Sequence, residues 1–542
     1  MKIALAQLNY ITGDFEGNTR KICDCIALAK KDNADLVVFA ELSVCGYPPR
    51  DFLAYPHFID QCEKYVKLIA EKCEGIAAVV GAPSRNSSGK GKHLYNSAYF
   101  LNNGKIENIV HKTLLPTYDV FDEYRYFEPN NEFHLIDFGG EKIALTICED
   151  LWNTGNNPLY RVNPMDALAA QKPTLMINIA ASPFDYTQAA KRKEILKINA
   201  AKYNLPLVYV NHWGAQTDLI FDGGSMMLNA DAEIVCGLKY FEEDFVCIDT
   251  KENQKAQTIS VPEKTELVHD ALVLGIRDYF KKLGFTKAIL GLSGGIDSAV
   301  VAVLAAEALG AENVKALLLP SSFSSDHSVT DALELAKNLN IPHETISIAP
   351  GYTRMEETLQ PYFQNLPFGV AEENLQARLR AMILMAFANK FGFILLNTSN
   401  KSEAAVGYGT LYGDMCGGIS VIGDVYKTDV YALANYINRN QKIIPENIIT
   451  KAPSAELRPN QKDSDSLPEY DLLDQILECY IEKSLGLDEI VAKGFDESVV
   501  RRVLKMVNDN EWKRHQAPPI LRVSPRAFGM GRRMPIAAKY LS

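Results

Sequence analysis

The sequence lacks any run of about 18 consecutive apolar residues, which a membrane-spanning helix requires. Residues 1–7 become polar too soon for a secretory signal peptide. An excess of positive charge is also lacking, because 56 Lys and Arg residues are outnumbered by 67 Asp and Glu residues, and the formal net charge is −11. This balance argues against a nucleic-acid partner and against an anionic membrane surface. We therefore expect a cytoplasmic protein that binds neither nucleic acid nor membrane.

A second cysteine pair near Cys23-x-Cys25 is missing as well, and the ten cysteines are scattered over 542 residues. Because Cys23 and Cys25 lie in a helical pattern, we interpret them as packing residues rather than zinc ligands. Reduced thiols are the expected state, and a disulfide-stapled scaffold is excluded. Hydrophobic residues make up 47% and charged residues 23%, as in an ordinary globular protein. The length predicts two to four domains.

The first half of the chain alternates predicted strands with predicted helices, which indicates a layered α/β domain over residues 1–250. The strands are expected at 2–8, 36–40, 77–82, 97–101, 143–147, 175–179 and 207–210, and the helices at 19–31 and 191–203. Residues 250–258 are polar and lack apolar anchors. They predict a solvated linker over 251–265, followed by a second domain at 266–542.

Three chemically useful side chains follow apolar strands in the first domain: Glu41, Lys112 and Cys148. A carboxylate could take the proton of a thiol, and an ammonium would stabilise both the thiolate and an oxyanion formed on a substrate carbonyl. Each residue alone has an ordinary explanation, because a buried cysteine is usually a small hydrophobe and charged residues after strands are usually solvated. Spacing alone leaves both interpretations open.

Residues 39–48 (FAELSVCGYP), 111–116 (HKTLLP) and 146–152 (TICEDLW) resemble the three signature segments of the nitrilase superfamily, in the same order. The resemblance covers about residues 1–250 and implies an αββα sandwich. It also implies Cys148 as nucleophile, Glu41 as general base, Lys112 as thioimidate and oxyanion stabiliser, and Glu123 as a second carboxylate. In the glutaminase branch, the matching glutamine-binding positions are Tyr118, Ser182 and Gln188. The last departs from the lysine that is common there.

The second half is organised around residues 291–298 (GLSGGIDS), which lie between an apolar strand and an apolar helix. Glycines allow backbone N–H groups to approach an anion, and a helix N-terminus adds unpaired donors. Asp297 suits a Mg²⁺ ion that accompanies a polyphosphate. The loop lacks the Gly-Lys-Ser/Thr ending of a Walker A motif. Two alternatives remain: the Gly-x-Ser-x-Gly elbow of α/β-hydrolases, and a glycine turn that only packs a helix on a sheet.

This loop resembles the pyrophosphatase loop of the ATP pyrophosphatases, which cleave ATP to AMP and pyrophosphate. Around it, strands are expected at 288–290, 314–319, 345–348 and 393–396, and helices at 268–283, 299–306, 329–338 and 374–390. The alternation predicts a Rossmann-like, doubly wound parallel sheet with its ligand at the carboxyl ends of the strands. The resemblance implies these ATP-binding residues: Gly291, Leu292, Ser293, Gly294, Gly295, Ile296, Asp297, Ser298, Thr398 and Ser454.

Residues 373–380 (ENLQARLR), 397–403 (NTSNKSE) and 407–414 (GYGTLYGD) resemble the NAD synthetase branch of that family. A plain amphipathic helix with solvated arginines is the alternative for the first of them. The resemblance implies that Glu403 joins Asp297 at Mg²⁺. The deamido-NAD-binding residues that it implies are Asn374, Arg378, Glu403, Asp414, Lys427 and Lys513.

Over almost its full length the chain resembles the glutamine-dependent NAD synthetases. The family implies that glutamine supplies ammonia, that deamido-NAD is adenylated by Mg²⁺-ATP, and that ammonia then displaces AMP. An enclosed passage for ammonia and a homodimer or higher homo-oligomer are further expectations. Two alternatives remain: the same machinery could amidate another carboxylate or a nucleotide base, or the nitrilase-like half could serve assembly alone. The intact Glu41, Lys112 and Cys148 argue against the second.

Overall fold

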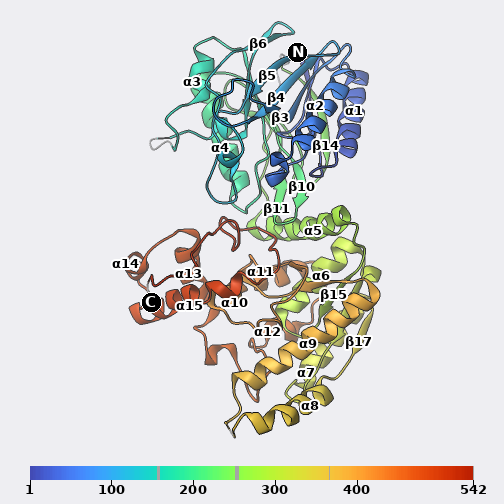
Figure 1. Ribbon diagram of the computed structural model, residues 1–542, viewed down its shortest axis with the longest axis vertical. Coiled ribbons are helices and arrows are strands. Elements are labelled where there is room, and N and C mark those ends of the chain that lie inside the picture. The colour runs from blue at the N-terminus through green and yellow to red at the C-terminus, as the bar shows by residue number, and fades with distance from the viewer. Residues whose placement is uncertain (156–158, 251–254, 365, 541–542) are drawn as a thin grey trace. The chain divides into compact units, whose positions relative to one another are not determined.

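The computed structural model describes residues 1–155, 159–250, 255–364 and 366–540. The chain folds into two compact units, Met1–Pro262 and Glu263–Ser542 (Figure 1). Residues 251–254 of the expected linker lie outside the described residues. Residues 255–262 belong to the first unit, where Ile259 packs against the core and the backbone N–H of Gln257 donates to Ile234 O at 2.7 Å. This part of the expected linker is therefore anchored rather than fully solvated.

The first unit contains two six-stranded sheets and a separate two-stranded hairpin. The first sheet runs β14 (Asp244–Asp249), β1 (Lys2–Gln7), β2 (Leu36–Val38), β3 (Ala77–Arg85), β4 (Leu94–Asn102) and β5 (Lys105–His111). The second runs β13 (Ile234–Gly237), β12 (Met226–Leu228), β9 (Leu207–Val210), β8 (Leu175–Ile179), β7 (Glu141–Ile147) and β6 (Ile136–Phe138). The hairpin pairs β10 (Trp213–Gln216) with β11 (Leu219–Asp222).

Successive side chains along a strand point to opposite faces of its sheet, and this alternation builds the layers. In β1, Ile3 and Leu5 enter the core between the two sheets, whereas Ala4 and Ala6 pack under the helices α1 (Phe15–Lys31) and α2 (Pro56–Ala70). The helices α3 (Pro164–Ala169) and α4 (Gln188–Tyr203) cover the second sheet. The predicted αββα sandwich is thereby confirmed (Figure 1).

The second unit is built on a fully parallel five-stranded sheet in the order β17-β16-β15-β18-β19. Its strands are β15 (Ala288–Gly291), β16 (Val314–Leu318), β17 (His343–Thr345), β18 (Ile394–Asn397) and β19 (Ile419–Ser420). Numbered along the chain this order is 3-2-1-4-5. The chain therefore adds strands on one side of β15 first and then continues on the other side with β18, so the strand order reverses between β15 and β18. The predicted doubly wound sheet is confirmed, and ligands of such sheets bind at this reversal.

Helices complete the second unit. They are α5 (Lys264–Leu283), α6 (Ile296–Leu309), α7 (Asp326–Asn338), α8 (Ala349–Leu359), α9 (Val370–Phe391), α10 (Lys401–Val406), α11 (Lys427–Ile437), α12 (Glu446–Thr450), α13 (Tyr470–Leu477), α14 (Leu487–Val491), α15 (Glu497–Asp509) and α16 (Glu511–Arg514). Leu384 and Ala388 of α9 pack on Ile289 and Leu317 of the sheet. A separate apolar cluster joins α10, α13 and α15.

The strand expected at 345–348 is wrong in its bounds, because the edge strand β17 ends at Thr345. Ile346 and Ile348 still donate backbone hydrogen bonds to Leu318 O and Pro320 O. An edge strand has a neighbour on one side only. The segment after Thr345 still forms hydrogen bonds with the chain at the end of β16, but it has no second neighbour that would keep its backbone extended.

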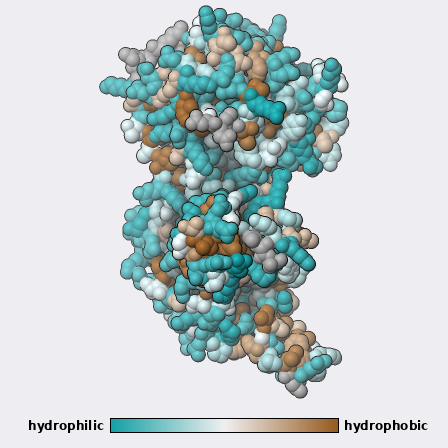
Figure 2. All heavy atoms as spheres, turned by 90° about the vertical axis from the view of Figure 1, so that its left-hand side faces the viewer, coloured by the Kyte–Doolittle hydropathy of each residue, from teal (hydrophilic) through white to brown (hydrophobic). Residues whose placement is uncertain are grey.

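No helix in the described part of the chain is long and apolar enough to cross a membrane. The face drawn in Figure 2 is mostly hydrophilic, and hydrophobic residues gather there only in separate patches. All ten cysteines are free thiols.

Candidate functional site

In the first unit, the ends of three strands place charged groups around one cysteine. Glu41 follows β2, Lys112 follows β5, and Cys148 follows β7 at the start of a short 3₁₀ turn, Cys148–Leu151. The Nζ atom of Lys112 donates to Glu41 Oε1 at 2.7 Å and to Glu123 Oε2 at 2.8 Å. The lysine side chain is fully buried. The structure therefore brings together the four residues expected to carry catalysis in this unit.

Both oxygens of Glu41 are held in place. The side-chain amide of Asn96 donates to Oε1 at 2.7 Å, and the backbone N–H of Ala181 donates to Oε2 at 2.9 Å. Tyr47 donates its hydroxyl to Glu123 Oε1 at 3.0 Å. These contacts fix the orientation of both carboxylates before any substrate binds. Sequence reasoning missed Asn96 and Tyr47, although Tyr47 lies in the segment that resembles the nitrilase superfamily.

Burial sets the protonation of this site. Burial raises the pKa of the Cys148 thiol, and the nearby Glu41 raises it further while Lys112 opposes the shift. Burial also raises the pKa of Glu123 to about 7 against the effect of Lys112. For Lys112, burial favours the neutral amine, but Glu123 and Glu41 together hold its pKa above the ordinary value. The thiol therefore stays protonated until a neighbouring base accepts its proton.

Asp150 ties the lysine to the cysteine, and sequence reasoning missed it. Its Oδ1 accepts the backbone N–H groups of Thr113 and Leu114 at 3.0 and 2.9 Å, and its Oδ2 accepts that of Ile147 at 3.0 Å. These donors flank Lys112 and Cys148 respectively. Cys148 itself has φ +44°, a strained value for a residue with a side chain. The buried carboxylate therefore stabilises the sharp turn at Cys148 and holds that turn against the segment that follows Lys112.

The expected glutamine contacts fall into two groups. Gln188 is the first residue of α4, and its side-chain amide donates to Ser182 Oγ at 3.3 Å. Tyr118 instead donates its hydroxyl to Glu149 Oε1 at 2.8 Å, and Tyr160 donates to the same oxygen at 3.1 Å. Burial raises the pKa of Glu149 to about 7. Glu149 was part of the quoted 146–152 segment, but spacing gave it no role.

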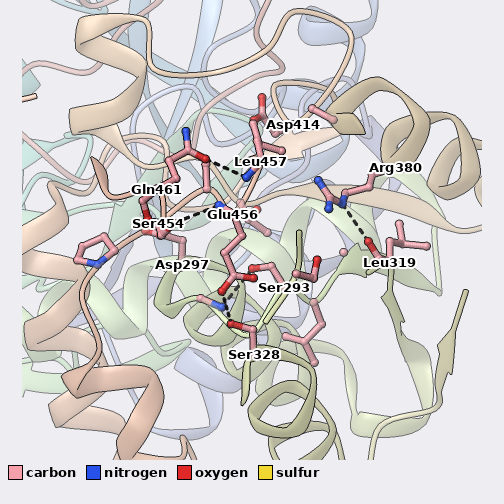
Figure 3. A pocket seen from close by; sticks show the side chains of 18 of the residues that line it. Ser293, Asp297, Leu319, Ser328, Arg380, Asp414, Ser454, Glu456, Leu457 and Gln461 are labelled. Atoms are coloured by element: carbon pink, nitrogen blue, oxygen red, sulfur yellow. Dashed lines mark hydrogen bonds between the residues drawn. The ribbon is translucent and has the colours of Figure 1, made fainter. Parts of the chain in front are cut away.

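In the second unit, a cavity of about 810 Å³ opens at the carboxyl ends of the strands (Figure 3). Most of the expected ATP and metal residues line it: Gly291, Leu292, Ser293, Gly295, Ile296, Asp297, Thr398, Glu403 and Ser454. Asp414 and Lys427 line it as well. Gly294 and Ser298 belong to the same loop but are not among the residues that line the cavity. Thr398 directly follows β18, beside the reversal of the sheet.

The loop over 291–298 is held by its own serines and by one close backbone approach. Ser293 Oγ accepts the backbone N–H of Gly295 at 3.1 Å, and the hydroxyl of the buried Ser298 donates to Gly295 O at 3.1 Å. Gly294 has φ +82°, and a Cβ there would lie 2.2 Å from Ser328 O of α7. Only glycine satisfies both the backbone angle and this contact.

A charged cluster lies beside the loop. The Nζ atom of Lys427 donates to Asp297 Oδ2 and, at 3.3 Å, to Glu403 Oε1. Asn400 donates its side-chain amide to Asp297 Oδ1 at 2.9 Å. Burial raises the pKa of Glu403 to about 8, Lys427 opposes this, and Asp297 adds to it. Two carboxylates with buried charge, next to a phosphate-type loop, fit a hard cation that also takes phosphate oxygens and water as ligands.

Within the described residues, no three His, Cys, Asp or Glu side chains are grouped so as to hold a metal by themselves. Mg²⁺ is usually bound through one or two carboxylates and substrate phosphates. Asp297 and Glu403 are the residues that would hold it.

The remaining expected dinucleotide residues gather around residues 407–414. Asn374 Oδ1 accepts the hydroxyl of Thr410 at 2.7 Å, and Asp414 Oδ1 accepts the Thr410 backbone N–H at 2.6 Å. Arg378 donates to Leu411 O at 3.2 Å, and Lys513 donates to Gly407 O and Gly409 O. Asp414 of this group lines the same cavity as Glu403 and Lys427, whose side chains pair with each other and, through Lys427, with Asp297.

Residues 451–463 form a strap that lines the cavity, and Ser454 is its one residue for which the sequence indicated a binding role. Ser454 Oγ donates to Gln461 O at 2.6 Å and accepts the backbone N–H of Glu456 at 3.1 Å. The Glu456 side chain points to α7, where Oε1 accepts the hydroxyl of Ser328 at 2.7 Å (Figure 3). The strap is therefore internally bonded and anchored to the helix beside the phosphate-type loop.

Comparison with known proteins identifies both units. The carbon-nitrogen hydrolase family model matches residues 2–258, and the NAD synthase model matches residues 268–517. A glutamine-dependent NAD(+) synthetase of Synechocystis sp. is 47% identical, and the match covers 99% of both chains. The chain belongs to the glutamine-dependent NAD(+) synthetases. The family member of Thermotoga maritima is 40% identical over 100% of this chain and 99% of its own.

A solved family structure has the same architecture. The glutamine-dependent NAD+ synthetase from Acinetobacter baumannii, in complex with adenosine diphosphate, matches with a TM-score of 0.79 and 39% identity. The match covers 99% of this chain and 98% of that one. The synthetase from Cytophaga hutchinsonii, at 23% identity and a TM-score of 0.83, shows the same fold.

Proposed function

We propose that this chain converts deamido-NAD+ to NAD+ and uses glutamine as the nitrogen donor and ATP as the source of energy. The first unit hydrolyses glutamine to glutamate and ammonia. The second unit activates the nicotinate carboxylate, which as an anion is a poor electrophile, and then exchanges the activating group for ammonia.

In the first unit, Glu41 accepts the Cys148 thiol proton as sulfur attacks the side-chain amide carbon of glutamine. Lys112 stabilises the oxyanion, ammonia leaves with the returned proton, and water hydrolyses the resulting thioester. Glu123 holds Lys112 in this position. We assign glutamine binding to Tyr118, Ser182 and Gln188. Support comes from the 2.7 Å contact of Lys112 with Glu41 and from the complete burial of the lysine.

In the second unit, an oxygen of the nicotinate carboxylate attacks the α-phosphorus of ATP, and pyrophosphate leaves. Ammonia then attacks the acyl carbon of the acyl-adenylate, and AMP leaves with the carboxyl oxygen. The 291–298 loop binds the phosphates through its backbone N–H groups, with Thr398 and Ser454 as further ATP contacts. We assign deamido-NAD binding to these residues: Asn374, Arg378, Glu403, Asp414, Lys427 and Lys513. Mg²⁺ held by Asp297 and Glu403 would neutralise phosphate charge.

The observation that carries this proposal is the full-length 47% identity to a glutamine-dependent synthetase. The test uses the full chain with ATP, Mg²⁺, deamido-NAD+ and amide-¹⁵N glutamine, with products read by mass spectrometry. Labelled NAD+ with equal amounts of AMP and pyrophosphate is expected. Glutamate without NAD+ would overturn the assignment of the second unit. NAD+ formed from ammonium salts but never from glutamine would overturn that of the first.

We also propose a cytoplasmic homodimer, or a higher homo-oligomer, assembled through the second unit. The ten free thiols suit a reducing compartment. Helix α9 exposes Met382, Met385 and Phe391, with 62%, 41% and 57% of their surfaces accessible, which suits a protein contact. Size-exclusion chromatography with light scattering tests the assembly. A monomer at micromolar concentration would contradict it.

A further inference from the structure

Lys427 occupies the position between the two carboxylates expected to hold Mg²⁺. Its ammonium donates to Asp297 Oδ2 and to Glu403 Oε1. The lysine side chain is only 3% exposed, against 19% for Asp297 and 16% for Glu403. Within the described part of the chain, the ion pairs of both carboxylates go to this one lysine.

The backbone beneath this ammonium is held by a hydrogen bond, whereas the lysine side chain between them can rotate about its single bonds. Lys427 is the first residue of α11, and its backbone N–H donates to Ser402 Oγ at 2.9 Å. Asn400 holds the other oxygen of Asp297. The lysine carries its charge on a flexible four-carbon chain and lines the same cavity as the phosphate-type loop. The ammonium is therefore the movable member of the cluster.

An ammonium and a divalent cation that are held against the same two carboxylates repel each other at close range. Metal entry must break both lysine contacts and leave a buried positive charge without a partner, which is costly unless an anion arrives with the metal. A polyphosphate is such an anion. Metal and nucleotide would each lower the cost of binding the other.

We propose that Lys427 acts as a tethered substitute for the metal in the free enzyme, and that it transfers to the nucleotide phosphates when metal and nucleotide enter together. This deepens the proposed function, because it rests on a site that takes a metal polyphosphate. The lysine thereby makes the binding of metal and nucleotide cooperative. It also protects the paired carboxylates from mutual repulsion while the site holds neither ligand.

The test measures Mn²⁺ binding to the full chain by electron paramagnetic resonance, without nucleotide and with saturating α,β-methylene-ATP. Lys427→Met and Lys427→Arg are the variants. Without nucleotide, Lys427→Met is expected to bind Mn²⁺ about tenfold more tightly than the wild type, because the competing charge is gone. Lys427→Arg keeps the charge and stays weak. With the analogue the order of the Mn²⁺ affinities reverses, because Lys427→Met has no ammonium to pair with the phosphates of the bound analogue.

A loss of packing at Lys427 would not produce this reversal of order. Equal or weaker Mn²⁺ binding by Lys427→Met without nucleotide would overturn the proposal, as would tight binding by Lys427→Arg. Adding Glu403→Gln to Lys427→Met must abolish the gain, and a gain that survives would place the metal elsewhere. Retained glutaminase activity and a single cooperative thermal transition confirm folding. These binding measurements contain no deamido-NAD+ and do not depend on NAD+ synthesis. A failure of the proposed function would appear only in the product assay, so the two failures can be distinguished.

Discussion

Replacement of Gly294 by alanine tests the phosphate-type loop directly. A Cβ at this position would lie 2.2 Å from Ser328 O and 2.9 Å from its carbonyl carbon, both of them backbone atoms. Ordinary contact begins at 3.4 Å, so the loop or α7 must move by about 1.2 Å (3.4 − 2.2). The positive φ of Gly294 adds about 1–2 kcal/mol of strain. Because Ser328 is held by Glu456 and Lys451, we expect the loop to move.

A displacement of about 1 Å in a positioning element reduces turnover by roughly 100-fold. We therefore expect Gly294→Ala to lower ammonium-driven NAD+ synthesis about 100-fold and to leave glutaminase activity intact. The assay follows AMP release with ammonium chloride as donor, in parallel with glutamate release from glutamine.

Gly392→Ala is the matched control. Gly392 also has a positive φ, +72°, but no other side chain or distant backbone atom lies within 4 Å of the place that its Cβ would take. It lies at the C-cap of α9, where the substitution costs about 1 kcal/mol of stability. Its activity should stay within about twofold of the wild type. Wild-type synthesis by Gly294→Ala, or a comparable loss in Gly392→Ala, would refute the argument from the Ser328 contact.

Three further outcomes are expected. Cys148→Ala should abolish glutamine-driven synthesis and leave ammonium-driven synthesis unchanged; a parallel loss of both would remove the assigned nucleophile. Asp150→Asn should lower the free energy of unfolding by about 1–3 kcal/mol and should also lower glutaminase kcat. The reason is that an amide N–H₂ then faces either the Ile147 N–H or the Thr113 and Leu114 N–H groups. Unchanged thermal unfolding would contradict this. Burial raises the pKa of Glu149 to about 7, so the stability that its protonated form contributes is fully present below about pH 4.5 and is lost as pH rises through 7. Glu149→Gln should flatten this decline of the thermal midpoint with pH. An unaltered slope would refute the assignment of the decline to Glu149.

The sequence could predict which strand ends carry chemistry, because apolar runs define the strands and the next residue is then placed at the sheet edge. Lys112 and Cys148 follow this logic, whereas β2 ends at Val38, two residues before the expected strand end, so that Glu41 does not directly follow it. Glu123 does not, since it begins a 3₁₀ turn in a loop, and only the family resemblance indicated it. Spacing predicts positions on strands well and positions in loops poorly.

Contacts between distant segments could not be predicted from one sequence. Asp150 is 36 residues from Leu114, and Lys427 is 130 residues from Asp297, yet each pair is in direct contact. No local pattern specifies such pairs, because they depend on how the loops fold back over the sheets. For the same reason the sequence did not indicate that Lys427 pairs with Asp297 and Glu403.

Both units use one lysine to neutralise two carboxylates, but the surroundings give the lysines different freedom. Lys112 and its partner Glu41 are 0% and 1% exposed, so no ion can enter and the ammonium must act where it stands. Lys427 borders a cavity of about 810 Å³ and pairs with carboxylates that are 19% and 16% exposed. A charged ligand can reach those carboxylates from the cavity. The same charge pattern therefore serves fixed electrostatic stabilisation in one unit and exchange of a cation in the other.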